Sequence, residues 1–195
     1  MSTNSTLKTA ILADDLSALA ALLTSPPDPT ITPLRALSLS AALSRPISFS
    51  DLITQHPTLT TSFNNQDLLI NAVGSGSIPI WRIILAHRPE AKDQRFGHYG
   101  TVVERCVIGG ERVLLEYLLA EGARVEATGR PILLRARLCG ASEEIKELLV
   151  RYGARPVSKE EEEEEGLVGH QGGGSVLGGL WVTLLDLAER AGLRG

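Results

Sequence analysis

Short aliphatic segments recur along this chain, and each one ends in large apolar residues followed by proline or glycine. Paired leucines of this kind bury the inner face of an amphipathic helix. A steady period in such a pattern predicts a repeat architecture. The segments close at Pro26, Pro57, Pro89, Gly122 and Gly153, which are 31, 32, 33 and 31 residues apart.

Each period contains two short helical stretches with a break between them. The first carries a small residue, which lets the first helices of neighbouring periods approach closely, and the second is aliphatic. Glycine after a helix supplies a left-handed cap that other residues resist. Trp81 lies on the apolar face of its helix, which predicts a core position. The small residues are Ala10, Ser40 or Ala41, Ala72, Cys106 and Ala136, and the breaks fall at Asp14-Asp15, Arg45-Pro46, Gly76, Gly109-Gly110 and Gly140.

The fourth period resembles the ankyrin-repeat family. Ankyrin repeats follow the pattern G-x-T-P-L-H-x-A-A-x-x-G, and their second helix ends in L-L-x-x-G-A. Residues 100–110 and 118–123 follow that pattern at the same spacing, with Val102 in the place of the proline and Glu104 in that of the histidine. Residues 32–35, Thr-Pro-Leu-Arg, are similar to T-P-L-H. The resemblance implies an all-α, ankyrin-like helical-repeat solenoid of about five repeats over residues 5–157.

Near the end of the chain the repeat period is interrupted and then resumes. Residues 183–192 are similar to a first ankyrin helix, so we expect residues 180–195 to form a half-repeat that caps the stack. Before them, residues 158–179 contain six consecutive glutamates (160–165, the glutamate run) and seven glycines. Charge repulsion and backbone entropy oppose folding there, which predicts an acidic, glycine-rich flexible insertion.

Composition narrows the functional classes. The chain is 43% hydrophobic and 22% charged, which excludes wholesale disorder, and its net charge of −4 gives no global basic field for nucleic acid or an anionic membrane. No apolar run reaches the roughly 18 residues of a membrane helix. The first residues lack the order of a signal peptide. We therefore expect an intracellular protein, cytoplasmic or nuclear and not secreted, with no membrane partner.

The sequence contains no catalytic constellation, so we expect neither enzymatic activity nor a cofactor or metal. Cys106 and Cys139 lie one repeat apart, and helices stacked about 10 Å apart are beyond the reach of a disulfide. The alternative is a small enzyme or enzyme subunit with a site in the groove. That site would use Glu104, His98 or Cys106, but no motif spacing pairs any of these with a second group.

The resemblance implies that another protein binds at the loop tips and on the exposed side of the first helices. The loop of residues 93–99 provides Arg95, Phe96, His98 and Tyr99, and aromatic and arginine side chains are the common anchors of interfaces. For each ring, packing back against the adjacent loop is the alternative. Arg130 in the next loop completes this candidate contact surface.

Arg105 and Arg135 fall at corresponding positions of successive first helices. We expect their side chains to lie side by side and to form a basic strip for an acidic partner. One alternative is intramolecular pairing with Glu104, Glu126 or the glutamate run, which would mask the binding face if it folded back. A second alternative, nucleic-acid binding by the strip, predicts an affinity that falls steeply with salt. The net acidic charge argues against nucleic acid, and the sequence does not identify the protein partner.

Overall fold

The computed structural model describes residues 3–26, 28–97, 100–126, 131–158 and 160–161. These residues form α-helices and two short 3-10 helices, and their only β-structure is one isolated bridge between Arg95 and Thr101. None of the described helices is long and apolar enough to cross a membrane. The helices are α1 Thr3–Leu12, α2 Leu16–Thr24, α3 Pro33–Ala42, α4 Pro46–Gln55, η1 Pro57–Asn64, α5 Gln66–Gly74, α6 Ile78–His87, η2 Pro89–Asp93, α7 Val102–Gly109, α8 Arg112–Ala120, α9 Ile132–Leu138 and α10 Glu143–Arg151.

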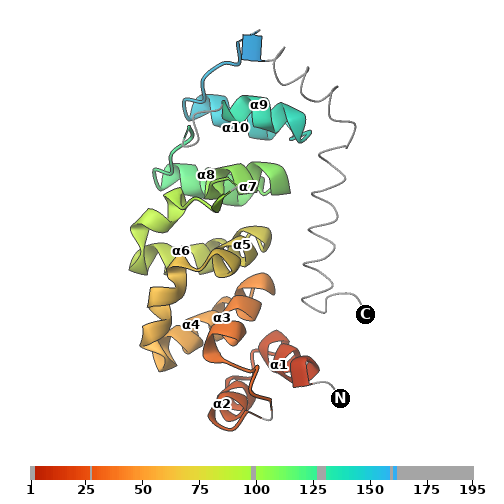
Figure 1. Cartoon of the computed structure of the whole chain (residues 1–195), viewed down its shortest axis with the longest axis vertical. Helices are drawn as coiled ribbons and strands as arrows, with labels where there is room; N and C mark the ends of the chain where they lie inside the picture. The colour runs from red at the N-terminus through yellow and green to blue at the C-terminus, as the bar shows by residue number, and fades with distance from the viewer. Residues whose placement is uncertain (1–2, 27, 98–99, 127–130, 159, 162–195) are drawn as a thin grey trace.

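The helices pair along the chain, and the pairs stack into a column (Figure 1). Each first helix (α1, α3, α5, α7, α9) contacts the next first helix, so these five form one side of the column. The second helices (α2, α4, α6, α8, α10) form the other side. The predicted all-α helical-repeat solenoid is therefore confirmed.

The breaks between paired helices lie where the sequence predicts them. At each break one residue adopts a left-handed backbone conformation, which glycine adopts without steric cost. Three of these residues are glycines, at 76, 110 and 140, with φ between 62° and 73°. In the first two repeats the same position is held by Asp14 (φ 49°) and Ser44 (φ 54°).

Helix starts are fixed by polar side chains. Thr32 caps α3 by accepting a hydrogen bond from the backbone N–H of Arg35, so this helix begins at the Thr-Pro-Leu-Arg segment. Thr101 and Glu104 form a reciprocal capping box at the start of α7. Such caps satisfy backbone donors that have no partner within the helix.

A continuous core runs between the two layers of helices. Trp81 is fully buried, as predicted. The stacked rings of Phe49 and Phe63, whose centroids are 6.1 Å apart, belong to the same core. The small residues predicted on the first helices are all buried, and this allows neighbouring first helices to pack closely. They are Ala10, Ser40, Ala41, Ala72, Cys106 and Ala136.

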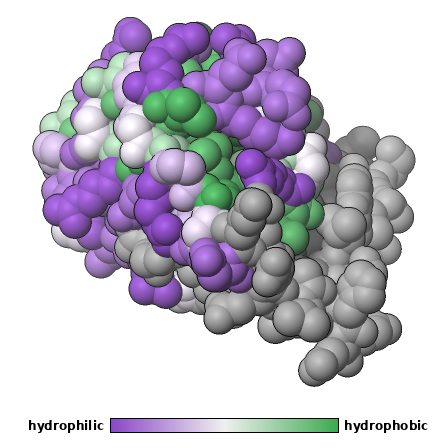
Figure 2. All heavy atoms as spheres, turned by 90° about the horizontal axis from the view of Figure 1, so that it is seen from above, coloured by the Kyte–Doolittle hydropathy of each residue, from purple (hydrophilic) through white to green (hydrophobic). Residues whose placement is uncertain are grey.

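The α9–α10 end of the column presents an incompletely covered face. Leu119 of α8 packs under the last described repeat and is 4% exposed, whereas Val150, one repeat later, is 58% exposed. Val107 is buried, but Arg137 at the corresponding place on α9 is exposed. Figure 2, which looks onto this end, shows hydrophobic side chains gathered between hydrophilic ones. The predicted cap, residues 180–195, lies outside the described residues, as does most of the predicted insertion.

Candidate functional site

The loop between repeats three and four folds back on itself like a small hairpin. The backbone N–H of Phe96 donates to the carbonyl of Gly100 (2.7 Å), and that of Val102 donates to the carbonyl of Gln94 (3.2 Å). This geometry points successive side chains to opposite sides. Arg95 is exposed to solvent, whereas Phe96 is 1% exposed and belongs to the hydrophobic core.

Phe96 is therefore corrected from a contact residue to a core residue. Of the two interpretations of this ring, the structure shows packing against the protein. The physical reason is the hairpin, which turns Phe96 inward and Arg95 outward. His98, Tyr99 and Arg130 lie outside the described residues.

Arg105 and Arg135 lie on α7 and α9, and both are half-buried. The Nε of Arg135 lies 3.9 Å from the Oε1 of Glu104. Glu104 is itself 4% exposed, and its Oε2 accepts a hydrogen bond from the Thr101 backbone N–H at 2.7 Å. For Arg135 the structure thus shows intramolecular pairing across two repeats, and Glu104 links the start of α7 to α9.

Gly100 leaves the space that Glu104 occupies. Its φ of +83° is in the left-handed region, and a Cβ at this position would overlap the Glu104 carboxylate. A side chain at residue 100 would displace this carboxylate from the cap of α7. The glycine therefore positions the carboxylate that meets Arg135.

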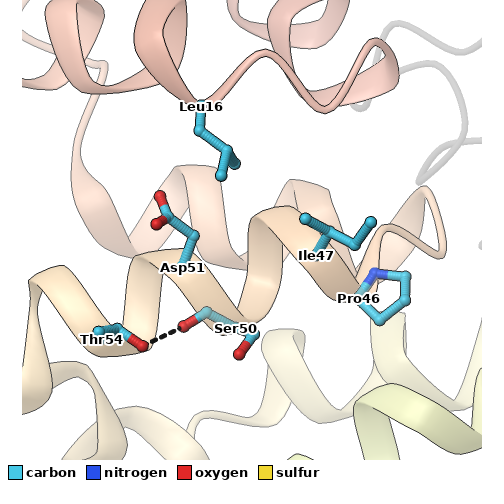
Figure 3. Close-up of a pocket in the computed structure, with 6 residues that line it drawn as sticks. All are labelled: Leu16, Pro46, Ile47, Ser50, Asp51 and Thr54. Carbon is cyan, nitrogen blue, oxygen red and sulfur yellow. Dashed lines mark hydrogen bonds between the residues drawn. The ribbon is translucent and has the colours of Figure 1, made fainter.

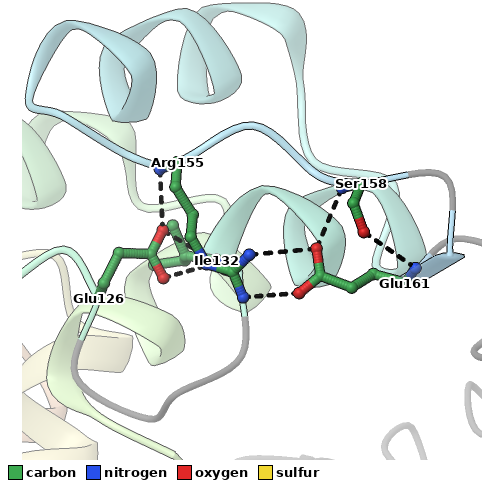
Figure 4. A network of polar contacts seen from close by, with 5 residues as sticks. All are labelled: Glu126, Ile132, Arg155, Ser158 and Glu161. Atoms are coloured by element: carbon green, nitrogen blue, oxygen red, sulfur yellow. Dashed lines mark hydrogen bonds and ion pairs between the residues drawn. The ribbon is translucent and has the colours of Figure 1, made fainter.

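Two carboxylates hold the backbone of the repeat that follows them. The Oδ1 of Asp93 accepts from the backbone N–H of Arg124 (2.7 Å), and the Oε1 of Glu126 accepts from that of Arg155 (3.2 Å). Glu126 also lies within hydrogen-bond distance of the backbone N–H of Ile132 (3.3 Å) (Figure 4). Sequence reasoning missed these contacts. The signal for them was the repeated tripeptide Gly-Ala-Arg at residues 122–124 and 153–155.

Arg88 performs a similar linking role one repeat earlier. Its Nη1 donates to the carbonyl of Phe63 (2.8 Å), its Nη2 to Gln94 (3.1 Å) and its Nε to Glu90 (3.1 Å). Each nitrogen of this guanidinium thus donates a hydrogen bond within the chain. It fixes the loops at the ends of repeats two and three to each other.

The described residues hold little that resembles catalytic chemistry. Burial raises the pKa of the Cys106 thiol well above its ordinary value, which disfavours the nucleophilic thiolate. Glu104 is occupied in the capping box. No group of three or more histidine, cysteine, aspartate or glutamate side chains in the described part of the chain is placed to hold a metal ion.

A shallow hollow of about 450 Å³ lies between α2 and α4 (Figure 3). Leu16 and Ile47 supply apolar side chains to it, and Asp51 on α4 supplies its carboxylate. The Asp51 carboxylate accepts a hydrogen bond from Gln55 on its own helix (2.7 Å). The hollow therefore contains a single carboxylate that is already partnered.

Comparison with known proteins supports the fold. No protein-family model matches the sequence, and no curated protein matches it. The structure is similar to a crystal structure of the human ASB11 ankyrin repeat domain, with a TM-score of 0.50 and 21% sequence identity over 76% of this chain and 84% of that one. At this identity the likeness shows the fold: this chain is folded as a stack of ankyrin repeats.

Proposed function

We propose that this protein is a non-catalytic protein–protein interaction module, an adaptor or a regulatory subunit. The observation that carries the proposal is a stack of first helices with arginine side chains at corresponding positions, Arg105 on α7 and Arg135 on α9, beside the exposed Arg95. Repeat stacks present extended surfaces of this kind, on which one partner touches several repeats.

The proposed contact surface comprises the loop and first-helix residues of repeats three to five. Arg95 supplies an exposed guanidinium at the hairpin, and Arg105 and Arg135 supply half-buried ones on the helices. His98, Tyr99 and Arg130, which the sequence places in the adjoining loops, complete it. Phe96 is excluded because its ring is buried.

The experiment compares the proteins captured by the tagged wild-type chain and by a triple variant, Arg95→Ala with Tyr99→Ala and Arg130→Ala, using mass spectrometry. Loop side chains that do not pack cost about 0.5 kcal/mol or less when truncated. We therefore expect the variant to lose the captured partner while its circular dichroism melt is nearly unchanged.

The matched control is Arg112→Ala with Arg151→Ala, which removes two exposed arginines from the second helices α8 and α10. We expect the control to retain the partner. Retention by the triple variant, or equal loss in both variants, would place the contact face elsewhere.

A further inference from the structure

Two arginines occupy the same place in successive loops. Arg124 and Arg155 each follow a glycine with φ between 81° and 90° and an alanine that is nearly buried, at 7% and 8% exposure. The left-handed glycine turns the chain out of the preceding helix, and the alanine anchors the turn. The arginine that follows is exposed in both loops.

Neighbouring carboxylates fix the backbones of these arginines. Asp93 holds the N–H of Arg124, and Glu126 holds the N–H of Arg155. Arg95, two residues after Asp93, is exposed on the same loop. We call Arg95, Arg124 and Arg155 the arginine row. The backbones of Arg124 and Arg155 are therefore positioned before any ligand arrives, which lowers the entropy cost of binding.

The last arginine of the row already holds a carboxylate. The Nη2 of Arg155 donates to the Oε1 of Glu161 at 2.6 Å, and its Nη1 donates to the Oε2 at 3.2 Å. Glu161 also accepts from the Ser158 backbone N–H (3.0 Å), while its own N–H donates to the Ser158 hydroxyl (3.2 Å) (Figure 4). Two parallel bonds to one carboxylate are the strong, planar mode of arginine recognition.

The other members of the row have no such partner. In the described part of the chain, the side chains of Arg95 and Arg124 make no hydrogen bond or ion pair. Glu161 is the second residue of the glutamate run, so the chain's own acidic segment engages one end of the row through this residue.

We propose that the arginine row is a docking surface for an acidic peptide segment of another protein, and that the glutamate run of this chain competes for it at Arg155. The inference rests on the proposed function and names the chemistry of the partner. Carboxylates of the partner bind Arg124 and Arg95 as Glu161 binds Arg155. Release of Glu161 adds a third guanidinium to the surface.

An acidic peptide fits this row better than a nucleic acid does. Asp93 and Glu126 lie between the arginines, and a continuous phosphate backbone would pass close to both carboxylates. Separate carboxylates on flexible side chains can meet the guanidiniums one at a time. The net charge of the chain, −4, also opposes a polyanion of high charge density.

The experiment titrates a fluorescein-labelled octaglutamate peptide with the full chain and follows fluorescence anisotropy. We expect Arg124→Ala to weaken binding about tenfold, because it removes one charge-assisted pair, and Arg155→Ala to weaken it less, because Glu161 already occupies that guanidinium. Glu161→Gln should strengthen binding several-fold by releasing Arg155. The control Arg151→Ala, on α10, should bind as the wild type does, and circular dichroism melts confirm that every variant is folded.

Three outcomes would overturn the inference. One is the absence of binding up to about 1 mM peptide, which is weaker than a useful docking contact. The second is equal binding by wild type and Arg124→Ala. The third is competition by an oligothymidylate of equal charge as effective as unlabelled peptide, which would show a general polyanion site. If the peptide fails to bind while partner capture still depends on Arg95, Tyr99 and Arg130, the inference fails and the proposed function stands.

Discussion

The two halves of the stack satisfy their polar groups in different ways. Residues 16–75 contain five charged side chains and sixteen serines and threonines, whereas residues 88–161 contain 25 charged side chains and four serines and threonines. Both halves build the same paired helices. The difference therefore concerns how neighbouring repeats are connected, and not which fold is formed.

In the first half, six hydroxyls donate to the backbone of their own helix or turn. Thr24 donates to the carbonyl of Ala20, Thr54 to that of Ser50, and Ser40 to that of Leu37. Such bonds satisfy the hydroxyl but connect nothing beyond one turn. In the second half, carboxylates and guanidiniums reach across about 30 residues to the next repeat, as Glu126 does to Arg155.

The first half also has contacts between repeats, in which Ser48 donates to the Asp14 Oδ1 (2.7 Å) and the Asn71 amide donates to Ser38 (2.8 Å). These bonds join two side chains, whereas Asp93 and Glu126 hold the backbone of the next repeat. On that ground we infer that repeats three to five are coupled more tightly than repeats one and two.

The largest loss of stability should follow from a deletion at the α9–α10 end of the stack. Deleting residues 180–195 removes the leucines of the predicted cap, and burial of two or three of them contributes on the order of 3–6 kcal/mol as an upper estimate. Val150, 58% exposed, is the apolar side chain that such a cap would cover. We expect a lower melting temperature or aggregation, measured by circular dichroism and light scattering. Unchanged stability would show that this segment covers nothing.

Gly100→Ala should be the most destabilising single change at the candidate site. It imposes a left-handed backbone on alanine and displaces the Glu104 carboxylate from the capping box and from Arg135. The combined loss is about 2–4 kcal/mol in the free energy of unfolding, measured in urea. Gly97→Ala is the matched control, because its φ is also positive (52°) but its Cβ would meet open space. If the two variants lose equal stability, backbone strain alone is responsible.

The contrast between local and cross-repeat bonds is tested directly by Glu126→Gln and Thr54→Val. Glu126→Gln weakens two charge-assisted bonds to the next repeat and should cost about 1–2 kcal/mol. Thr54→Val removes a bond within one exposed turn and should change stability by about 0.5 kcal/mol or less. Urea denaturation compares them, and equal losses would contradict the proposed difference in coupling.

Ser44→Gly should stabilise the first half slightly. Ser44 has a φ of 54° at a break where repeats three to five have glycine. Relief of the left-handed strain, less the extra backbone entropy of glycine, leaves a gain of about 0.5 kcal/mol. A thermal melt of the variant measures the gain, and a loss of stability would mean that the serine hydroxyl stabilises the turn.

The smallest expected effect on stability is the pH dependence of the contact between Arg155 and Glu161, at the end of the arginine row. Hydrogen bonds from Arg155, then from the Ser158 backbone, hold the pKa of Glu161 below its ordinary value of 4.5. Glu126 faces the same guanidinium. Because the folded pKa is depressed, the stabilising contact is present above pH 4.5 and is lost as the pH falls through the lowered pKa. An NMR titration of Glu161 should show this depression, and Arg155→Ala should abolish it.

The period and the helix pairs could be predicted because burial repeats at fixed spacing in the sequence. The breaks at Gly76, Gly110 and Gly140 could be predicted because a left-handed cap selects glycine. The direction of the Phe96 ring could not, because it depends on a hairpin whose backbone bonds leave no pattern in residue types.

The contacts of Asp93 and Glu126 were not predicted, although the repeated Gly-Ala-Arg tripeptide marks the two loops that receive them. Each carboxylate meets a backbone N–H about 30 residues away, and every residue except proline carries such a donor. The pairing of Arg135 with Glu104 was weighed as an alternative because both residues are charged, but only the structure selects it. The type of a residue can suggest a side-chain partner, but it does not identify which backbone N–H a distant carboxylate will meet.

The equivalent placement of Arg124 and Arg155 in successive loops has a geometric consequence for any extended partner. Stacked helices lie about 8–10 Å apart, whereas an extended chain advances about 3.3 Å per residue. One step from Arg124 to Arg155 therefore equals three residues of the bound strand, and carboxylates at every third position meet successive guanidiniums. A partner with that spacing can bind in one register only. Residues 160–165 are all glutamate, so this segment has carboxylates at every third position in each of the three possible registers. It can therefore compete without a fixed register.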